Sequence, residues 1–234
     1  MFDFSGRVVI VTGAAGSLGS AIARAFQSAG AKLTLVDRAD GRLQQIFPEM
    51  ADSPDFFFAN SIDLTQADAV QAMVDGTLDH FGQIDVLVNV AGGYRAGTPV
   101  HETPIETWDF MLNINARSVF LTSGVVIPHM LEREYGRIVS VGARVAMRSR
   151  ANMAAYSVSK AAVVRLTESM SAELEGTGVY VNCILPRTID TPANRQAMPN
   201  ADYSRWTKPE AIAEVIMFLT SESACILTGA AIPV

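Results

Sequence analysis

The segment Val8-Val-Ile-Val-Thr-Gly-Ala-Ala-Gly-Ser-Leu-Gly19 joins an apolar, β-branched run to a turn that holds three glycines. A run of this kind fills a buried strand of a parallel sheet. Ile22 and Phe26 follow at helical spacing, and Gly30 is placed to end that helix. A strand, a glycine turn and a helix in this order predict a phosphate-binding loop, because backbone N–H groups and the helix dipole both point at an anion there. The spacing G-x-x-x-G-x-G leaves open a glycine-rich turn that binds nothing.

Strands and helices alternate along the rest of the chain. Further strands are predicted at Lys32–Val36, Phe56–Ser61, Ile84–Val88, Gly136–Val141, Tyr180–Leu185 and Gly229–Val234. Further helices are predicted at Thr65–Phe81, from Ile105 to about Glu132, from Tyr156 to about Glu175 and at Pro209–Leu219. This alternation predicts an α/β fold with a doubly wound parallel sheet of about seven strands flanked by helices. Because no linker-like stretch divides the 234 residues, we expect one domain over residues 1–234.

Asp37 stands at the carboxyl end of the second predicted strand. A carboxylate about 20 residues beyond the glycines accepts hydrogen bonds from a ribose diol and repels a 2′-phosphate. The neighbouring Arg38 could hold such a phosphate, but Asp37 would occupy the place of that phosphate. We therefore expect NAD(H) to be favoured over NADP(H).

Two other strand exits carry candidate cofactor contacts. Asp63 follows the third strand, where its carboxylate could meet an adenine amino group or could act only as a turn residue ahead of the next helix. Asn89-Val-Ala-Gly-Gly93 follows the fourth strand, and its small residues would let a cofactor approach the backbone.

Tyr156-Ser-Val-Ser-Lys160 places a phenol and an ammonium on one helix face, since residues four apart lie about 5–6 Å apart at Cβ. The pKa of a free phenol is about 10, and an adjacent positive charge is expected to lower the pKa of Tyr156 towards neutrality. The pair is predicted to transfer protons. The alternative is a tyrosine and a lysine on a solvated helix face.

The long predicted helix from Ile105 to about Glu132 contains Asn115, which could hold a water or a backbone group or could simply be exposed. The apolar side of this helix is expected to carry Trp108, Met111, Leu112, Val119 and Phe120. Later in the chain, Pro186–Thr207 is rich in Pro, Asn and Arg and is predicted to be irregular. Its length is unusual for a connection within a compact domain, which makes it a candidate lid.

Composition excludes several classes of function. A net charge of −6 argues against a nucleic-acid partner, because proteins that bind nucleic acids usually carry a basic patch. There is no run of 18 apolar residues and no signal-like start, so we expect a cytoplasmic protein without a membrane partner. Cys183 and Cys225 are expected to be packed free thiols. The three histidines lack ligand spacing, and we predict no metal.

Together these motifs resemble the short-chain dehydrogenase/reductase family along nearly the whole chain. The motifs are Thr12-Gly13…Gly16…Gly19, Asp63, Asn89-Val-Ala-Gly92, Asn115, Tyr156…Lys160 and Thr228-Gly229. The resemblance implies a Rossmann-type sheet and NAD(P)-dependent oxidoreductase activity on a small molecule. It implies Tyr156 as proton donor or acceptor, Lys160 as its electrostatic partner and ribose ligand, and Asn115 as the residue that orients a proton-relay water. The implied cofactor contacts are Gly13, Ala15, Ser17, Leu18, Gly19, Asp37, Asp63, Leu64, Asn89, Ala91, Gly92, Lys160, Pro186 and Thr188. Since the long helices commonly pack against their copies in this family, a homodimer or homotetramer is also implied.

The chain departs from the family pattern at two positions. The usual serine thirteen residues before the tyrosine is Ala143, and the usual proline-glycine after the sixth strand is Pro186-Arg187. Ser140 is the nearest hydroxyl, but its odd offset from Ala143 would direct it to the other face of the strand. The candidate substrate contacts are Ala143, Tyr94, Arg144 and Tyr156, with Tyr94, Arg144 or Thr188 as possible replacements for the missing hydroxyl.

Three functions remain open at this stage. Gly142-Ala143-Arg144, the aromatic Tyr94 after Gly93, and Leu185–Trp206 resemble the dihydropteridine reductase branch, which reduces quinonoid dihydropterins with NADH. The helix that carries Asn115 is instead similar to ordinary members of the family, which favours a carbonyl reductase or alcohol dehydrogenase of the 3-oxoacyl reductase kind. The minor alternative is a protein that senses NAD without turning it over, and the intact Tyr156 and Lys160 argue against it.

Overall fold

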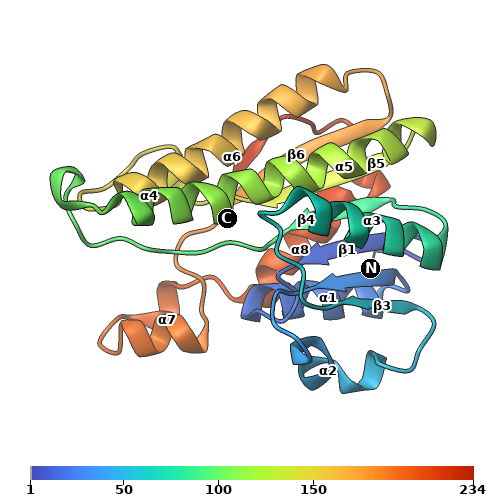
Figure 1. Ribbon diagram of the computed structural model, residues 1–234, viewed down its shortest axis with the longest axis horizontal. Helices are drawn as coiled ribbons and strands as arrows, with labels where there is room; N and C mark the ends of the chain where they lie inside the picture. Colours follow the sequence, from blue (N-terminus) through green and yellow to red (C-terminus); the bar gives the residue numbers. More distant parts are fainter. Residues whose placement is uncertain (1) are drawn as a thin grey trace.

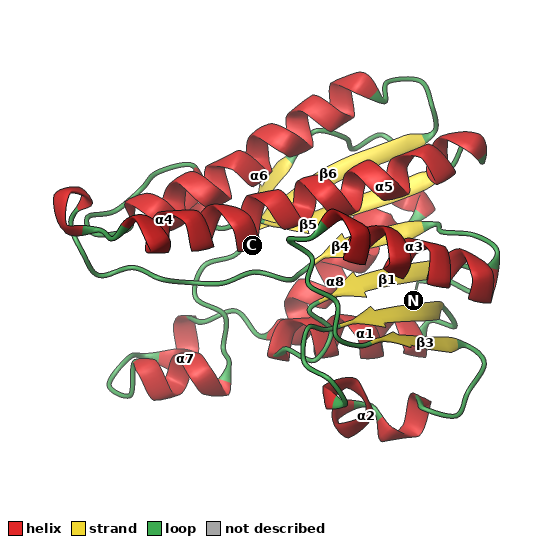
Figure 2. Ribbon diagram, in the orientation of Figure 1, coloured by secondary structure: helices red, strands yellow, loops and turns green. Residues whose placement is uncertain are grey.

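The computed structural model describes residues 2–234 as a seven-stranded parallel sheet with helices on both faces (Figures 1 and 2). The strands are β1 Val8–Thr12, β2 Lys32–Val36, β3 Phe56–Ala59, β4 Val86–Asn89, β5 Gly136–Val141, β6 Val179–Leu185 and β7 Ala231–Pro233. The α-helices are α1 Ser17–Ser28, α2 Arg42–Ile46, α3 Ala67–Phe81, α4 Ile105–Leu112, α5 Ser118–Glu132, α6 Ala154–Glu173, α7 Pro192–Ala197 and α8 Pro209–Thr220. Short 3₁₀ turns lie at Pro48–Met50, Val100–Glu102, Arg144–Ala146, Tyr203–Arg205 and Glu222–Ala224. The prediction of a doubly wound parallel sheet is confirmed.

The strand order is β3-β2-β1-β4-β5-β6-β7, so the direction of winding reverses beside β1. Val11 of β1 pairs with Leu35 on one side and with Val88 on the other. In open α/β sheets the crevice for ligands lies outside the carboxyl ends of the strands at this reversal. The topology therefore places the candidate site where β1 and β4 end.

Alternation along each strand builds two apolar cores. Val9 and Val11 point to the face that α1 and α8 cover, where they pack with Ile22 and Ile216. Ile10, between them, points to the other face, which α3, α5 and α6 cover (Figure 1). Both faces are buried because each strand of a parallel sheet lies between two layers of helices.

The predicted helix from Ile105 to Glu132 is one continuous helical run with a π-helical turn at Asn113–Arg117 between α4 and α5. Met111 and Val119 lie on its buried side as predicted, but Trp108 and Phe120 are 36% and 61% exposed. By length and composition alone, this run could cross a membrane, with a mean hydropathy of 1.4 over its most apolar window. Such a finding is weak support for a membrane span, because core helices of water-soluble proteins pass the same test.

Several predicted boundaries shift by a few residues. The third strand ends at Ala59 because Ser61 adopts a left-handed conformation with φ of 59°. The following helix begins at Ala67, since Asp63 and Thr65 form a turn before it. Cys183 is a buried free thiol as expected, whereas Cys225 is exposed, so the prediction of packing is wrong for Cys225.

The segment Pro186–Thr207 is more ordered than predicted. It contains α7, and Figure 1 shows α7 extending away from the sheet. The N–H of Thr207 donates to the carbonyl of Thr188 at 3.2 Å, and the N–H of Asp190 donates to the carbonyl of Thr207 at 2.9 Å. The segment is therefore a loop with a hydrogen-bonded base, which differs from an irregular connection.

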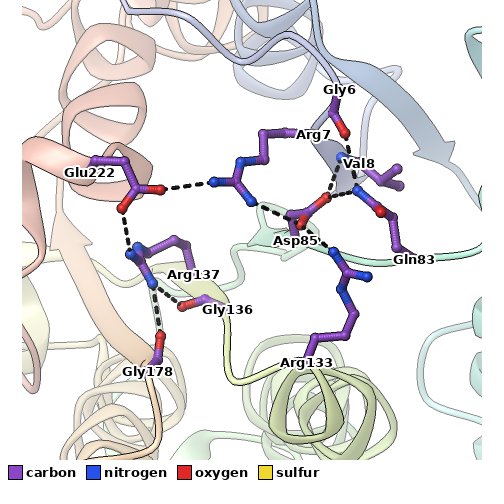
Figure 3. Close-up of polar contacts among 10 residues, drawn as sticks. All are labelled: Gly6, Arg7, Val8, Gln83, Asp85, Arg133, Gly136, Arg137, Gly178 and Glu222. Atoms are coloured by element: carbon purple, nitrogen blue, oxygen red, sulfur yellow. Dashed lines mark hydrogen bonds and ion pairs between the residues drawn. The ribbon is translucent and has the colours of Figure 1, made fainter.

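Asp85 lies at the amino ends of the strands and gathers four polar partners (Figure 3). Its carboxylate accepts from the Val8 N–H at 2.8 Å and from Gln83 Nε2 at 2.6 Å. Arg7 and Arg133 pair with the same carboxylate at 3.3 and 3.5 Å. The Asp85 side chain is fully buried, so these contacts replace the water that the charge loses.

Glu222 joins this cluster from the other end of the chain (Figure 3). Its carboxylate pairs with Arg7 at 3.0 Å and with Arg137 at 3.2 Å. Arg137 is buried and also donates to the carbonyl of Gly178 at 2.9 Å. The contacts connect segments that are far apart in the sequence and fix the amino end of the sheet.

Candidate active site

A cavity of about 580 Å³ lies at the carboxyl ends of the strands. The glycine turn forms part of its wall with Gly13, Gly16 and Gly19. Gly13 has a φ of +64°, and a Cβ there would lie 2.9 Å from the Cα of Ala91. A Cβ at Gly19 would collide with the carbonyl oxygen of Gly13. The turn therefore needs glycine both for its backbone conformation and for its close packing.

The turn leads into the amino end of α1, which has no side-chain cap. The first N–H groups of a helix lack partners within the helix and attract anions. Gly16, Leu18 and Gly19 all line the cavity at this place. A phosphate group would satisfy these donors.

Asp37 lines the cavity beside the glycine turn, with Arg38 and Arg42 nearby in the same wall. The Asp37 side chain accepts from the N–H of Ala39 at 2.9 Å and is 9% exposed. Its second oxygen has no hydrogen bond among residues 2–234 and remains free to accept from a ribose. The two guanidinium groups are exposed and could meet a phosphate at the same end.

Asp63 is a turn residue ahead of α3, and it also lines the cavity, where its contact with an adenine stays a prediction. Its carboxylate accepts from the N–H of Thr65 at 3.0 Å and from the Thr65 hydroxyl at 2.7 Å, which stabilises the turn before α3. These hydrogen bonds, led by the backbone N–H, lower the pKa of Asp63 below its usual value. Asp63 and Leu64 also line the cavity.

Tyr156 and Lys160 project from α6 into the same cavity. Lys160 donates from Nζ to the carbonyl of Val141 at 2.8 Å. Burial lowers the pKa of Lys160 to about 8. Burial also raises the pKa of Tyr156 to about 12, and the neighbouring Tyr94 acts in the same direction.

The prediction that Lys160 lowers the pKa of Tyr156 is therefore wrong for this structure. The loss of water around the phenol is the main cause, and Lys160 is itself desolvated and bonded to a carbonyl. The phenol of Tyr156 keeps its proton at neutral pH. This protonation state suits a group that donates a proton.

Asn115 is fully buried in the π-helical turn and does not line the cavity. Its Oδ1 accepts from the Gly93 N–H at 3.0 Å, and its Nδ2 donates to the Gly93 carbonyl at 3.1 Å. Nδ2 also donates to the Ser159 hydroxyl at 3.0 Å. π-Helical turns are frequent at functional sites, and this one joins the loop before Tyr94 to the helix that carries Tyr156.

Ala143 lines the cavity and is 7% exposed, in agreement with its predicted place. Ser140 is fully buried within β5, accepts from Asn89 Nδ2 at 3.3 Å and does not line the cavity. No serine or threonine occurs among the residues that line the cavity. The lining of the cavity therefore offers no aliphatic hydroxyl.

Tyr94 also lines the cavity and is 62% exposed. Its ring meets that of Tyr156 edge to face, with centroids 4.9 Å apart and planes at 83°. Aromatic pairs favour this arrangement. Two phenols thus share one wall of the cavity beside Ala143.

Six predicted site residues lie outside the lining of the cavity: Ala15, Ser17, Asn89, Asn115, Arg144 and Thr188. Ala15 packs in the core behind the glycine turn, and Ser17 is exposed at the start of α1. The Asn89 side chain accepts from Thr122 at 2.7 Å and joins β4 to α5 and β5. For these positions the motif predicted the segment correctly but not the direction of the side chain.

Arg144 and Thr188, two of the possible replacements for a hydroxyl at position 143, do not line the cavity. Arg144 is exposed in the 3₁₀ turn after β5, and the Thr188 carbonyl closes the base of the loop. Arg187 and Ile189, on either side of Thr188, line the cavity instead. The alternation of an extended backbone could have identified this pair from the sequence.

Other lining residues were also missed. Phe110 and Ile114 lie four apart in the helix that carries Asn115, and this spacing could have placed both on one face. Arg42 reaches the cavity from the start of α2 after Gly41, whose φ is 66°. No sequence signal marks Arg42. Within residues 2–234, no group of three or more His, Cys, Asp or Glu could hold a metal ion.

These features fit an extended dinucleotide. The uncapped amino end of α1 would hold its pyrophosphate, Asp37 a ribose hydroxyl, and Asp63 with Leu64 the wall around its base. Lys160 would reach the second ribose with the donors that Val141 leaves free. The phenols and Ala143 would then face the reactive end.

The chain is similar to known proteins over most of its length. The short chain dehydrogenase family matches residues 7–202. A 3-oxoacyl-[acyl-carrier-protein] reductase of Thermotoga maritima is 32% identical over 96% of this chain and 94% of its own length. D-threitol dehydrogenase of Mycolicibacterium smegmatis is 34% identical over 98% of this chain and 92% of its own length.

A solved structure of a reductase is also similar to this chain over nearly its whole length. The crystal structure of a 3-ketoacyl-(acyl-carrier-protein) reductase from Brucella melitensis complexed with NADH superposes with a TM-score of 0.88 and 29% identity, and the match covers 98% of this chain and 97% of that one. The chain belongs to the short-chain dehydrogenase family and is an NAD(P)-dependent oxidoreductase.

Proposed function

We propose that the protein interconverts a carbonyl compound and its alcohol with NAD(H), with Tyr156 as the general acid or base. One observation carries this proposal: Tyr156, Lys160 and Ala143 line the same cavity as the glycine turn and Asp37. The relatives named above include a 3-oxoacyl reductase and a threitol dehydrogenase, and both names describe chemistry at a carbonyl or hydroxyl carbon.

In the proposed mechanism the bound nicotinamide supplies or accepts the hydride. The substrate oxygen gains negative charge during reduction and takes the proton of Tyr156 Oη, so the product is an alcohol. Because the pKa of Tyr156 is about 12, this proton is present at neutral pH. In oxidation the phenol must first lose its proton and then accept that of the alcohol. Lys160 holds a positive charge near the phenol, and Asn115 fixes the Gly93 backbone.

NAD(H) over NADP(H) is part of the proposal. Asp37 is nearly buried in the cavity wall, and its carboxylate would repel a 2′-phosphate. Arg38 and Arg42 oppose this preference because they bring positive charge to the same wall. We give more weight to Asp37, since both arginines are exposed and water screens their charge.

A quinonoid dihydropterin is the second candidate substrate. The observation that favours it is Ala143 in a wall without serine or threonine. A hydroxyl at this position would stabilise charge on a carbonyl oxygen, whereas a conjugated quinonoid ring spreads that charge. The resemblance of Leu185–Trp206 to dihydropteridine reductase supports the same candidate.

Steady-state turnover of NADH and NADPH against a panel of acceptors tests these proposals. The panel should contain an acetoacetyl thioester, a cyclic ketone, a quinone and a quinonoid dihydropterin. Reduction of the first two, and its loss in Tyr156→Phe, would support the carbonyl reductase. Rapid reduction of the pterin alone would select the second candidate. Tight NADH binding with no turnover on any acceptor would favour a sensor of NAD.

We further propose that the protein is cytoplasmic and forms a homodimer or homotetramer. Phe120 on α5 and Val158 on α6 are 61% and 42% exposed, and exposed apolar side chains of this kind favour association. Light scattering of wild type and Phe120→Asp tests the assembly. A wild-type monomer at micromolar concentration would contradict it.

A further inference from the structure

The loss of the serine hydroxyl at Ala143 creates a chemical need in a carbonyl reductase. The substrate oxygen becomes negative during hydride transfer, and one proton donor, Tyr156, faces it by the proposed function. Removal of one such donor in other enzymes lowers the rate by about 10²–10³-fold. A reductase with alanine at this position therefore needs a second donor from elsewhere in the wall.

The side-chain donors in the wall are few. With serine and threonine absent, they are Tyr94, Tyr156, Lys160 and three arginines. Two of the arginines, Arg38 and Arg42, lie beside Asp37 at the other end of the cavity. Lys160 already donates to the Val141 carbonyl. Tyr94 and Arg187 remain as side-chain donors, and the ring of Tyr94 contacts that of Tyr156.

We propose that Tyr94 donates to the substrate oxygen the hydrogen bond that a serine at position 143 would otherwise donate. This role rests on the proposed function and extends it to a residue outside the family pattern. The ring contact of 4.9 Å brings the two phenols to one wall of the cavity. Tyr94 forms no hydrogen bond through its hydroxyl among residues 2–234, so that donor is available.

The backbone before Tyr94 is held for this task. Asn115 accepts from the Gly93 N–H and donates to the Gly93 carbonyl, which fixes the residue next to Tyr94 on both sides. A Cβ at Gly92 would lie 2.8 Å from Asn115 Oδ1. The ring of Tyr94 is nevertheless 62% exposed, so its hydroxyl can turn towards a bound oxygen. In this arrangement Asn115 is a positioning residue and Tyr94 a catalytic residue.

Substrates that place one oxygen between two phenols would suit this pair. Carbonyl compounds with a flat, conjugated group next to the carbonyl could also stack against the exposed Tyr94 ring. This substrate class includes aryl ketones, which are carbonyl compounds like the first candidate, and quinones, which are conjugated rings like the quinonoid dihydropterin.

Four variants test the role of Tyr94. Tyr94→Phe keeps the ring contact and removes the hydroxyl, and it should lower kcat about 10²-fold on the carbonyl acceptor that wild type reduces best, with little change in KM for NADH. Ala143→Ser in the Tyr94→Phe background should recover at least tenfold of this loss. Tyr94→Ala removes the ring as well and shows how much of kcat depends on its packing. Tyr180→Phe removes a hydroxyl outside the cavity, so this matched control should leave kcat unchanged.

A second measurement does not depend on turnover. The probe is 4-nitrophenolate, whose oxygen anion mimics the charged substrate oxygen, titrated into the enzyme with NAD⁺ and followed by absorbance. Its Kd should rise about tenfold in Tyr94→Phe and stay unchanged in Tyr180→Phe. If wild type reduced no acceptor, the proposed function would be contradicted, but the Kd of 4-nitrophenolate would still test whether Tyr94 donates to an oxygen anion. Wild-type kcat and unchanged probe affinity in Tyr94→Phe, with losses only in Tyr94→Ala, would overturn the inference and assign Tyr94 to packing.

Discussion

The polar side chains at the two ends of the parallel sheet differ in how many hydrogen-bond and ion-pair partners they have. At the amino end, the Asp85 carboxylate has four partners, and Arg137 donates to a carboxylate and to backbone carbonyls (Figure 3). At the carboxyl end, Lys160 and Asp37 each have one hydrogen bond, and the phenols of Tyr94 and Tyr156 share only a ring contact. At the amino end nearly every polar group has a protein partner, with the buried Nε of Arg137 as an exception, whereas the carboxyl end keeps donors and acceptors free for a ligand.

Because of this difference, we expect substitutions at the amino end to change stability and substitutions at the carboxyl end to change activity. A buried charge that loses its partners destabilises a fold by several kcal/mol, so the amino end should be sensitive to substitution in unfolding experiments. The free groups of the carboxyl end contribute little to folding, and their replacement should change turnover and leave stability nearly intact. The variants below test the contrast from the largest expected effect to the smallest.

Tyr156→Phe should give the largest loss of activity. The variant keeps the ring contact with Tyr94 and removes the group proposed as the acid, so turnover should fall by about 10²-fold or more. The Kd of NADH and the melting temperature should change little. Kinetics, fluorescence titration and thermal unfolding measure the three quantities. An equal loss of NADH affinity would instead assign Tyr156 a structural role.

Asp85→Asn should give the largest loss of stability. The side chain is fully buried, and an amide cannot accept all the hydrogen bonds of the carboxylate. Hydrogen bonds to charged groups contribute about 1.5–3 kcal/mol, and we expect a loss of about 2–3 kcal/mol in denaturant unfolding. Glu222→Gln is the matched control. Its carboxylate is 65% exposed, and the amide oxygen of glutamine can still accept from the buried Arg137, so the variant should cost less than Asp85→Asn, about 1 kcal/mol. Equal losses in the free energy of unfolding for the two variants would show that burial of the carboxylate does not decide its contribution to stability.

The pH dependence of oxidation should follow the high pKa of Tyr156. Oxidation needs the deprotonated phenol, so below pH 12 its kcat/KM should rise about tenfold per pH unit, whereas reduction should stay flat near neutral pH. Initial rates in both directions between pH 6 and about 9.5 check this, with folding monitored by circular dichroism. A plateau of the oxidation rate below pH 8 would show that Lys160 and the bound cofactor overcome the effect of burial.

Cofactor preference should respond to Asp37. Wild type is expected to have a higher kcat/KM for NADH than for NADPH, and Asp37→Ala should narrow this gap about tenfold because ribose bonds and phosphate repulsion are both lost. Arg38→Ala is the control and should widen the gap. A wild-type preference for NADPH would contradict the prediction and point to Arg38 and Arg42.

Sequence patterns predicted the segments of the fold better than the directions of side chains. The β-branched run Val8–Val11 and the glycines after it are local signals, and they placed the sheet and the loop correctly. The Arg7–Glu222 pair joins residues 215 positions apart, so no local signal could reveal it. The pKa of Tyr156 also escaped prediction, because it depends on burial by residues from several elements.

The candidate site shows the same limit. Asn89 and Thr188 stand in the predicted segments, but Asn89 turns into a buried polar network and Thr188 closes the loop base. Arg187 and Ile189 reach the cavity in place of Thr188. A motif specifies which backbone passes the site, whereas packing decides which side chain enters it.

The loop Pro186–Thr207 gives the smallest expected effect. Pro186, Arg187 and Ile189 at its base line the cavity, and the bonds of Thr207 to Thr188 and Asp190 hold that base together. Beyond the base, Arg195 pairs with Asp190 at 2.6 Å. The Arg195 side chain is 51% exposed and that of Asp190 15%, so water screens one side of the pair and the contact adds little stability. The outer part of the loop should therefore open without disturbing the sheet.

NADH should slow cleavage within residues 190–207 by about three- to fivefold in limited proteolysis, since a cofactor at the base would reduce local opening. Arg195→Ala should speed cleavage of the free protein and leave that of the NADH complex closer to wild type. Cleavage at a loop outside the cavity, such as the turn at Gly176, is the internal control and should be unaffected by NADH. Equal cleavage rates with and without NADH would show that the loop does not close over the cavity, and the free groups of the carboxyl end would then not include a mobile cover.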